Sequence, residues 1–272
     1  MNDMKERVEE FRGMGRELYD RLQLCTYPVA VKYVGDTAEI PDGFARPGDD
    51  GERLYPCTAF HYARRWGDSI AVTREDCGCA VFSAFHRWSG GPSGKTLRDA
   101  PNGLFDADVD VERHLKENYP ELFEDKQAER CAKIAGLIVS PLTEATFVPD
   151  AVLVYGNPGQ LTHADHSLGF GGRRVRSSFT GFAESCGIGG LKTFLTNRPQ
   201  AVLPGVGDRS LSGASENEMA IGLPGPVVFH VLENLFRTGK EYNPGMPFSC
   251  FAHGNRDFTR TMMERGLQRR GV

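Results

Sequence analysis

Hydrophobic residues recur along this chain with the period of an α-helix in some segments and with that of a β-strand in others. In the first segment Met4, Val8, Phe11, Leu18 and Leu22 follow one another at steps of three, four or seven. This spacing places them on one face and predicts a helix over residues 3–24. The next segment, residues 28–34 (PVAVKYV), alternates apolar side chains and predicts a strand.

The same two periods predict the rest of the secondary structure. Further strands are expected over residues 70–72, 151–155, 175–182, 201–203 and 219–221. Further helices are expected to begin near Cys57, after Cys79 and at Pro158, and to cover residues 107–118, 122–137 and 225–237. Strands and helices alternate without an internal repeat, so we expect a single α/β or α+β domain over residues 1–272. It would consist of a mixed β-sheet flanked by helices, with cysteines at strand-to-helix turns.

Composition and charge exclude several classes of protein. The chain is 40% hydrophobic and 25% charged, which is typical of a globular protein, and its formal net charge is −4. It therefore lacks the basic surface that nucleic-acid binding requires. No apolar run approaches the roughly 18 residues of a membrane helix, and the first residues, MNDMKERVEEF, lack the apolar core of a signal peptide. We expect a cytoplasmic protein with neither nucleic acid nor membrane as a partner.

Cysteine is the residue type that changes this picture most. The chain has seven, at positions 25, 57, 77, 79, 131, 186 and 250. In a reducing compartment disulfides are rare, so several thiols indicate metal binding or catalysis more than covalent cross-links. For any one of them, the alternative is a small buried hydrophobic residue, and Cys131 on a predicted helix is expected to be such a core residue.

Four cysteines share a local context. Cys57 falls in the first turn of a predicted helix, Cys77 and Cys79 directly precede another, and Cys186 lies in the glycine-rich segment 184–190. A helix N-terminus stabilises a thiolate, the form that attacks electrophiles and binds metals. Such positions can converge at one end of a sheet. Thiolates select zinc or an iron–sulfur cluster over hard cations, and C-x-C spacing is shorter than the C-x-x-C of zinc knuckles.

Two further motifs carry weaker signals. Residues 89–96 (SGGPSGKT) nearly match a phosphate-binding loop, but Ser89 stands at the first glycine and no strand is predicted before it. His163 and His166 are three residues apart on a predicted helix and share a face, as metal ligands can. No third ligand lies near them in sequence, and an exposed polar face explains the pair equally well.

Seven segments together resemble a known family. They are PVAVKY (28–33), YPCTAFHYAR (55–64), GDSIAVTREDCGCAVFSAF (67–85), AVLVYGNPGQL (151–161), GFAESCGIGG (181–190), PGVGDRS (204–210) and EMAIGLP (218–224). The chain thereby resembles, over most of its length, domain-of-unknown-function family 169, also called the archaeal cysteine-rich family. The resemblance implies that Cys57, Cys79 and Cys186 belong to the family pattern, whereas Cys77 is an addition. It implies a site built on cysteines but no particular reaction.

These observations lead to one hypothesis about function. Cys57, Cys79 and Cys186 would hold an iron–sulfur cluster of the 4Fe-4S type, with one iron open to act as a Lewis acid on a small-molecule substrate. The reaction would be a lyase-type elimination or desulfuration. Arg209, in the glycine loop of PGVGDRS, would orient substrate or move protons, and so would His86 and Glu184, with Gln160 and His163 as further candidates.

Three alternatives stay open. If Cys77 is a fourth ligand, the cluster is closed and a redox or sensing role, as in an oxidoreductase, is favoured. The protein is otherwise a binding module that presents a metal such as zinc, or a small ligand, without turnover. In the third alternative Cys79 is a nucleophile activated by a histidine such as His86, with no metal. The sequence leaves substrate, oligomeric state and strand order open.

Overall fold

A computed structural model describes residues 2–47, 53–88 and 110–235 together with Arg237. Within it, residues up to Leu235 form one compact unit. The expected single domain therefore holds for this part of the chain, and its extension to residue 272 lies outside the described residues. The near-match to a phosphate-binding loop at 89–96 and Cys250 also lie outside the described residues.

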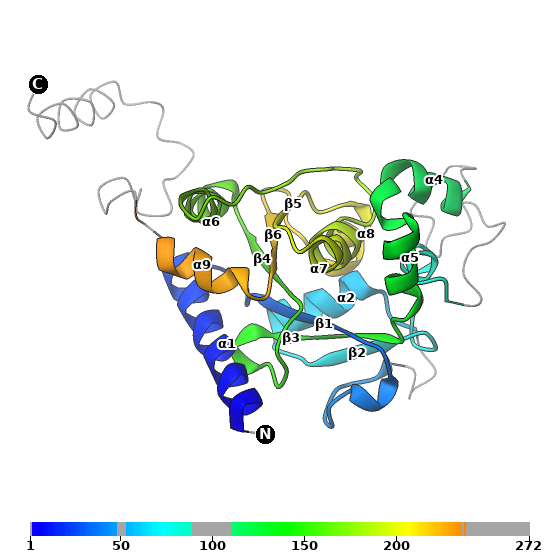
Figure 1. Cartoon of the computed structure of the whole chain (residues 1–272), viewed down its shortest axis with the longest axis horizontal. Coiled ribbons are helices and arrows are strands. Elements are labelled where there is room, and N and C mark those ends of the chain that lie inside the picture. Colours follow the sequence, from blue (N-terminus) through cyan, green and yellow to red (C-terminus); the bar gives the residue numbers. More distant parts are fainter. Residues whose placement is uncertain (1, 48–52, 89–109, 236, 238–272) are drawn as a thin grey trace, which may run out of the picture. The chain divides into compact units, whose positions relative to one another are not determined.

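A six-stranded sheet is the centre of the unit (Figure 1). Its strands are β1 (Val29–Val34), β2 (Ile70–Thr73), β3 (Gly136–Pro141), β4 (Ala151–Gly156), β5 (Gln200–Val202) and β6 (Met219–Pro224), in the order β2-β3-β1-β4-β6-β5. Every pairing between these strands is antiparallel. Parallel pairing occurs in isolated bridges, such as that between Leu54 and Cys77. With its helices, this sheet confirms the α+β alternative of the predicted fold class.

Helices of unequal length connect the strands. The longer ones are α1 (Asn2–Arg21), α4 (Val111–Asn118), α5 (Asp125–Ala132), α6 (Pro158–Phe170), α8 (Val206–Ser212) and α9 (Val227–Asn234). Shorter ones are α2 (Pro56–His61), α3 (Ala80–Phe85) and α7 (Thr193–Thr196), with 3-10 turns η1 (Thr37–Glu39), η6 (Pro120–Leu122) and η7 (Leu142–Glu144). Two segments are π-helical, η3 (Tyr62–Trp66) and η8 (Glu184–Lys192).

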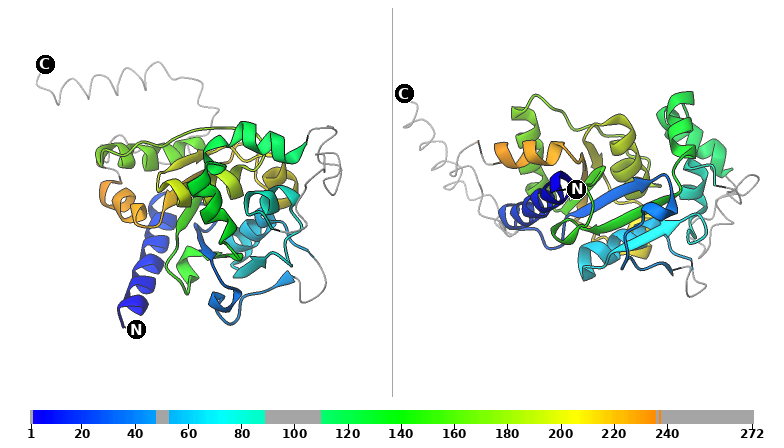
Figure 2. Two further views of the ribbon diagram at one scale, coloured as in Figure 1. Left: turned by 45° about the vertical axis from the view of Figure 1, so that its right-hand side comes forward. Right: turned by 60° about the horizontal axis from the view of Figure 1, so that its bottom comes forward.

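The sheet is buried on both faces. Val29, Val31 and Leu153 point into the main core, where they join Phe60 of α2 and Ile188 of η8. Side chains alternate along a strand, so the neighbouring residues of β4 point to the opposite face, which α6 and α9 cover. Helix α1 contacts α9 on that side (Figure 2). The cysteine-bearing helices therefore share the face of the sheet that carries the main core.

Strand β1 continues past the first residue of its neighbour β4. It pairs with β3 along all six residues but with β4 only from Val29 to Val31. Beyond that point the Asp150 carboxylate accepts a hydrogen bond from the backbone N–H of Tyr33 at 2.9 Å. An acidic side chain thus replaces a backbone partner, and it fixes Tyr33 at the place where the two strands part.

Three sequence-based expectations differ from the structure. The helix expected over 122–137 ends at Ala132, and the central strand β3 begins at Gly136. A short apolar run such as Leu137-Ile138-Val139 has the same signature in a buried strand as in a helix. The strand expected over 175–182 is absent apart from an isolated bridge at Arg176, because most of its side chains are exposed or half-exposed and add little to a core. The glycine-rich turn around Cys186 is a π-helix.

Candidate cysteine site

Cys57 lies in the first turn of α2, as predicted. Pro56 occupies the first helical position, where its fixed φ and missing N–H favour helix initiation. The Cys57 side chain is buried. Helix α8 packs against α2, and a Cβ placed on Gly207 of α8 would lie 3.7 Å from Cys57 Sγ. The start of α8 therefore forms one wall beside this thiol.

Cys77 and Cys79 follow the turn after β2. The Asp76 carboxylate holds that turn by accepting hydrogen bonds from the N–H of Thr73 (3.1 Å) and from its hydroxyl (2.7 Å). Cys79 is the N-cap of α3, and its sulfur accepts a hydrogen bond from Phe82 N at 3.4 Å. Leu54, just before α2, bonds through its N–H to Asp76 O and through its carbonyl to Gly78 N. These bonds place the starts of α2 and α3 next to each other.

Cys186 reaches the same region from η8, whose nine residues are all buried. Glycines allow this helix to approach the sheet closely. A Cβ on Gly222 of β6 would collide with the carbonyl oxygen of Gly189, and one on Gly189 would lie 2.9 Å from Val202. Single π-helical turns are frequent at functional sites. The close contact fixes the depth of Cys186 beneath the sheet face.

Four cysteines lie within electrostatic range of one another in a largely buried region, which we call the cysteine site (Cys57, Cys77, Cys79 and Cys186). Burial has the largest effect on Cys186 and raises the pKa of its thiol, and ionised Cys79 and Cys57 would raise it further. Ionised Cys77 would act in the same direction, more weakly than either. Cys79 would raise the pKa of Cys57 in the same way. In the described part of the ligand-free chain, no group of three or more His, Cys, Asp or Glu side chains is arranged to hold a metal ion.

Burial dominates the chemistry of these thiols. It raises the pKa of Cys79 to about 12, although the N–H groups at the start of α3 act in the opposite direction. It also raises the pKa values of Cys57 and Cys186 well above their ordinary range. The expectation of a thiolate stabilised by the helix N-terminus is thus wrong for the ligand-free chain, whose thiols stay protonated near neutral pH. A thiophilic metal would reverse this, because metal binding displaces the proton.

Asp208 is an acidic residue whose charge acts on all three family cysteines, and it was not among the residues predicted from the sequence. It is buried on α8, and its carboxylate accepts hydrogen bonds from Gly205 N (3.1 Å) and Ser185 N (3.3 Å). Its charge raises the pKa of Cys57, Cys79 and Cys186. Burial in turn raises the pKa of Asp208 itself. An acidic residue three positions after the glycine of Pro-Gly-Val-Gly-Asp was the available signal, since it can bond back to the helix start.

The neighbouring Arg209, which the sequence predicted as a site residue, points away from the cysteine site. Its Nη1 donates a hydrogen bond to Ser215 O at 2.6 Å in an exposed setting. Consecutive helical residues point about 100° apart, so one of this pair faces the site and the other faces out. Arg209 is therefore placed to hold the chain after α8, at residues 213–215.

His86 lies in an aromatic cluster at the other end of α3 from Cys79. Its ring is 4.5 Å from that of Phe82 and 5.1 Å from that of Trp88, between centroids. Burial lowers the pKa of His86 to about 4, so the imidazole is neutral at physiological pH. Its Nδ1 lies 3.4 Å from Cys131 O. Cys131 is itself fully buried, as expected of a core residue.

Glu184 is completely buried two residues before Cys186. One carboxylate oxygen accepts hydrogen bonds from Thr180 N (2.5 Å), Gly181 N (2.8 Å) and the Thr180 hydroxyl (3.0 Å). The other oxygen, Oε2, is buried and has no hydrogen-bond partner among the described residues. The charge of Glu184 raises the pKa of Asp208 slightly, so the two carboxylates belong to one acidic region beside the cysteines.

The buried cation Arg64 holds an aromatic side chain next to the acidic region of the site. Arg64 of η3 forms a bidentate ion pair with Glu218, at 2.6 and 3.2 Å, and its guanidinium lies 4.3 Å above the ring of Tyr155. The Tyr155 hydroxyl in turn lies within the electrostatic reach of Asp208 and Cys57, whose charges raise its pKa, again after burial. Arg64 thus fixes the aromatic side chain that lies next to the acidic region.

The two remaining candidates lie elsewhere. Gln160 is buried at the start of α6, where its amide donates to Leu22 O and Gln23 O and its oxygen accepts from Asn157 N. His163 and His166 lie on the same helix, half-buried and exposed respectively. No group of three or more His, Cys, Asp or Glu side chains within the described ranges is arranged to hold a metal ion. The histidine pair therefore gains no third ligand there.

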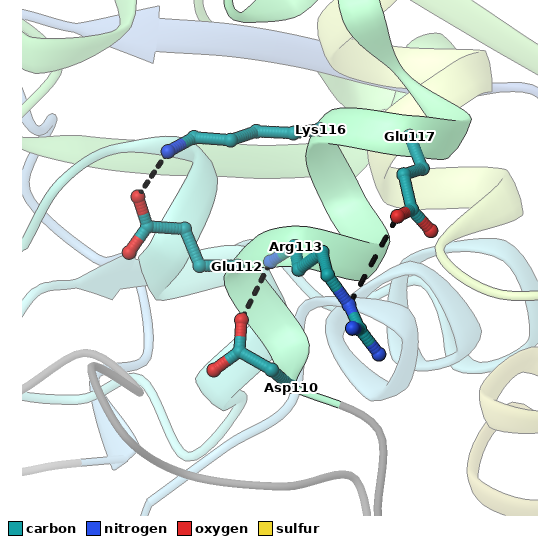
Figure 3. Close-up of a pocket in the computed structure, with 5 residues that line it drawn as sticks. All are labelled: Asp110, Glu112, Arg113, Lys116 and Glu117. Atoms are coloured by element: carbon teal, nitrogen blue, oxygen red, sulfur yellow. Dashed lines mark hydrogen bonds and ion pairs between the residues drawn. The ribbon is translucent and has the colours of Figure 1, made fainter.

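A surface hollow on α4 is a further feature of the structure (Figure 3). Lys116 pairs with Glu112 at 2.6 Å and Arg113 with Glu117 at 3.9 Å, both one helical turn apart, while Asp110 caps the helix. The paired side chains are about half or more exposed, so they form a solvated helix face and not a site. None of the helices in the described part is long and apolar enough to cross a membrane.

Comparison with known proteins identifies the family. The model of the family DUF169, described as uncharacterised ArCR, matches residues 17–234. The chain belongs to this family. The match contains the sheet, α2, α3 and η8, and so the whole cysteine site. No curated protein and no solved structure matches the chain. The expected family membership is thus confirmed.

Proposed function

We propose that this member of the DUF169 family is a cytoplasmic protein that binds an iron–sulfur cluster through Cys57, Cys79 and Cys186. The observation that supports the proposal is that Cys57 of α2 and Cys79 at the start of α3 both act electrostatically on Cys186 of η8, in a largely buried region. All of them are free cysteines. Soft sulfur donors of this kind favour iron–sulfur clusters and zinc over hard cations.

The sequence spacing of Cys77 and Cys79 favours a cluster over a single zinc ion, because C-x-C is shorter than the C-x-x-C of zinc knuckles. Zinc binds sulfur ligands directly at about 2.3 Å, whereas a cluster places several iron atoms and sulfides between its ligands.

Cys77 fits the role of a neighbour better than that of a fourth ligand. Its thiol donates to Cys79 O at 3.6 Å and accepts a hydrogen bond from Ser83 Oγ at the same distance. Its charge also acts on Cys186 less than those of Cys79 and Cys57. Three ligands correspond to a 4Fe-4S cluster with one iron open, which supplies Lewis-acid chemistry when bound.

The chain supplies carboxylates next to that position. Asp208 is oriented by Gly205 N and Ser185 N, and Glu184 has one buried oxygen that bonds to none of the residues the structure describes. A carboxylate so placed accepts a proton from a bound small molecule, as a lyase-type elimination or desulfuration requires. We therefore retain Glu184 as a proposed proton acceptor and add Asp208 as a second one.

The metal-free alternative receives less support. A nucleophilic Cys79 needs a lowered pKa and a nearby base. Burial instead raises the pKa of Cys79 to about 12, and His86 lies beyond the far end of α3. A binding or sensing role without turnover uses the same ligands, and it differs from the lyase in predicting a bound cluster with no catalysed reaction.

The deciding experiment is purification without oxygen, followed by an absorption spectrum and analysis of iron and acid-labile sulfide. We expect a broad band near 400 nm, the region where cluster charge transfer falls, with matching iron and sulfide. Replacing Cys57, Cys79 or Cys186 by serine should abolish or strongly reduce loading. Cys25→Ser and Cys131→Ser are the matched controls and should load as the wild type does.

Two outcomes would contradict the proposal. One is a colourless wild-type protein that takes up no iron and sulfide on reconstitution. The other is full loading of all three single variants. Cys77→Ser separates the two forms of the site, because a bystander leaves loading intact whereas a fourth ligand does not.

A further inference from the structure

The hydroxyl of Tyr33 is a buried hydrogen-bond donor without a partner. The side chain is 7% exposed, and its ring stacks on Phe194 at 5.1 Å and lies 6.1 Å from the ring of His86. Within the described part of the chain, no group accepts a hydrogen bond from the Tyr33 hydroxyl. A phenylalanine would fill the same space without the cost of removing a hydroxyl from water, so an unpaired hydroxyl here calls for a functional reason.

The hydroxyl points at the helix that carries Cys186. A Cβ added to Gly190 of η8 would lie 2.6 Å from Tyr33 Oη, so only glycine leaves room for the phenol at this point. Among charged groups Cys186 has the largest effect on Tyr33, ahead of Asp150 and Cys131. Burial and these charges raise the pKa of Tyr33 well above its ordinary value. The group is therefore a protonated donor directed at η8, the helix on which Cys186 lies.

The backbone holds Tyr33 in this orientation. It lies on β1 beyond the last residue pair with β4, where Asp150 accepts the hydrogen bond of its N–H. Across β1 its partner is Leu137 of β3, a fully buried residue. A side chain placed on a central strand between two aromatic rings has little freedom to find another acceptor.

We propose that the Tyr33 hydroxyl donates a hydrogen bond to a sulfide of the cluster held by Cys186, and that this bond sets the reduction potential of the cluster. The inference rests on the proposed function. A hydrogen bond to a cluster sulfur stabilises the reduced form, which carries the greater negative charge. Tyr33 is thus a positioning and tuning residue and not a ligand.

The test is Tyr33→Phe, measured in two states of the full chain. In the loaded protein we expect iron and sulfide content equal to that of the wild type and a more negative midpoint potential in an EPR-monitored redox titration. In the ligand-free protein we expect a thermal midpoint equal to or above that of the wild type. Tyr119→Phe is the matched control, because the Tyr119 hydroxyl accepts from Ala183 N at 3.0 Å and bonds to Thr180 Oγ1 at 2.5 Å. Its ligand-free thermal midpoint should fall.

Each result bears on a separate statement. A loaded Tyr33→Phe protein with an unchanged potential overturns the inference about Tyr33 and leaves the cluster in place. A fall in its ligand-free thermal midpoint as large as that of Tyr119→Phe shows an ordinary structural hydrogen bond and also overturns it. Failure of the wild type itself to take up iron and sulfide overturns the proposed function, and with it the inference.

Discussion

Burial keeps the thiols of Cys57, Cys79 and Cys186 protonated in the ligand-free chain, and this has a measurable consequence. The thiolate is the form that reacts with alkylating agents. We expect these three cysteines to react with iodoacetamide at pH 7.5 at least about 10-fold more slowly than Cys25, because their raised pKa values limit thiolate formation. Access is restricted as well for Cys57 and Cys186, which are buried, whereas Cys79 is half-buried. Cys25, which is exposed, is the internal control. Peptide mass spectrometry over a time course measures all four together.

The same experiment addresses the metal-free alternative. A Cys79 that is alkylated faster than Cys25 would mean that an activating base lies beside it, and it would restore the cysteine nucleophile as the leading function. In cluster-loaded protein the three ligands should be protected further, because a coordinated sulfur no longer attacks the reagent.

The buried imidazole of His86 predicts a dependence of stability on pH. Burial lowers its folded-state pKa from 6.5 to about 4, so the unfolded chain binds a proton at mildly acid pH that the folded chain does not. Stability from this residue is present above about pH 6.5 and is lost as the pH falls toward 4. Between pH 7.5 and 5.0 the loss amounts to roughly 2 kcal/mol.

Urea unfolding of ligand-free wild type and His86→Phe at both pH values measures this loss. The wild type should lose roughly 2 kcal/mol more than the variant. The comparison between the two proteins isolates His86, because Asp150 and Asp208 have raised pKa values and affect both proteins alike. Equal losses would mean that His86 is protonated in the folded chain, or is solvated there.

The candidate site shows how far single residues could be predicted. Cys57 and Cys79 were recognisable because proline and a strand-to-helix turn mark helix starts in sequence. Asp208 was not, since the same glycine loop carries Arg209, and only the rotation of α8 decides which of the two faces inward. From the sequence, Tyr33 was predicted only as one apolar position of a strand. Its unpaired hydroxyl became apparent only in the structure, where η8 packs against it.

At the scale of elements, prediction failed where local signals conflict with long-range contacts. The run Leu137-Ile138-Val139 is fully or almost fully buried in β3 because β1 and β2 pair with it on either side. The spacing of apolar residues along the sequence does not reveal these pairings. The segment Glu184–Lys192 reads as a turn because it has three glycines. It is helical because those glycines let it lie against β5 and β6, and tertiary packing overrides weak helix propensity.

Gly222→Ala tests the contact that seats η8. The new methyl group would meet Gly189 O and, at 2.5 Å, Thr193 Oγ1, and a backbone carbonyl cannot move without shifting the helix that carries Cys186. We expect a loss of about 1–3 kcal/mol in urea unfolding, as for other overpacked cores, together with reduced cluster loading.

Gly13→Ala provides the contrast for that variant. Gly13 lies inside α1 with nothing within 4 Å of an added Cβ, so alanine should stabilise the protein by about 0.5–1 kcal/mol and leave loading unchanged. If Gly222→Ala unfolds at the same urea concentration as the wild type, η8 can shift freely and the close fit described above is not needed.

At the scale of the molecule, the cysteine site connects segments that are remote in sequence. Cys57 and Cys79 belong to the segments around β2 at one edge of the sheet, whereas η8 packs on β5 and β6 toward the other edge. Helix η8 also contacts α2 and α3, so a group bound to all three cysteines would add a direct link between segments that pack on different halves of the sheet. Ligands that bind only the folded state stabilise it, and most strongly where they join segments that open separately.

Hydrogen–deuterium exchange of loaded and ligand-free protein tests this link. Loading should slow exchange by about 10-fold or more, equivalent to about 1.4 kcal/mol of local stability, in α3 and in η8 together. Helix α1 packs against η7 and α9, away from the cysteines, and serves as the internal reference, with a smaller change. In Cys186→Ser, exposure to iron and sulfide should protect neither segment, because two cysteines at one edge cannot bridge the sheet. Protection confined to the segment around Cys57 and Cys79 in the wild type would place the bound group at that edge alone and would remove Cys186 from the ligand set.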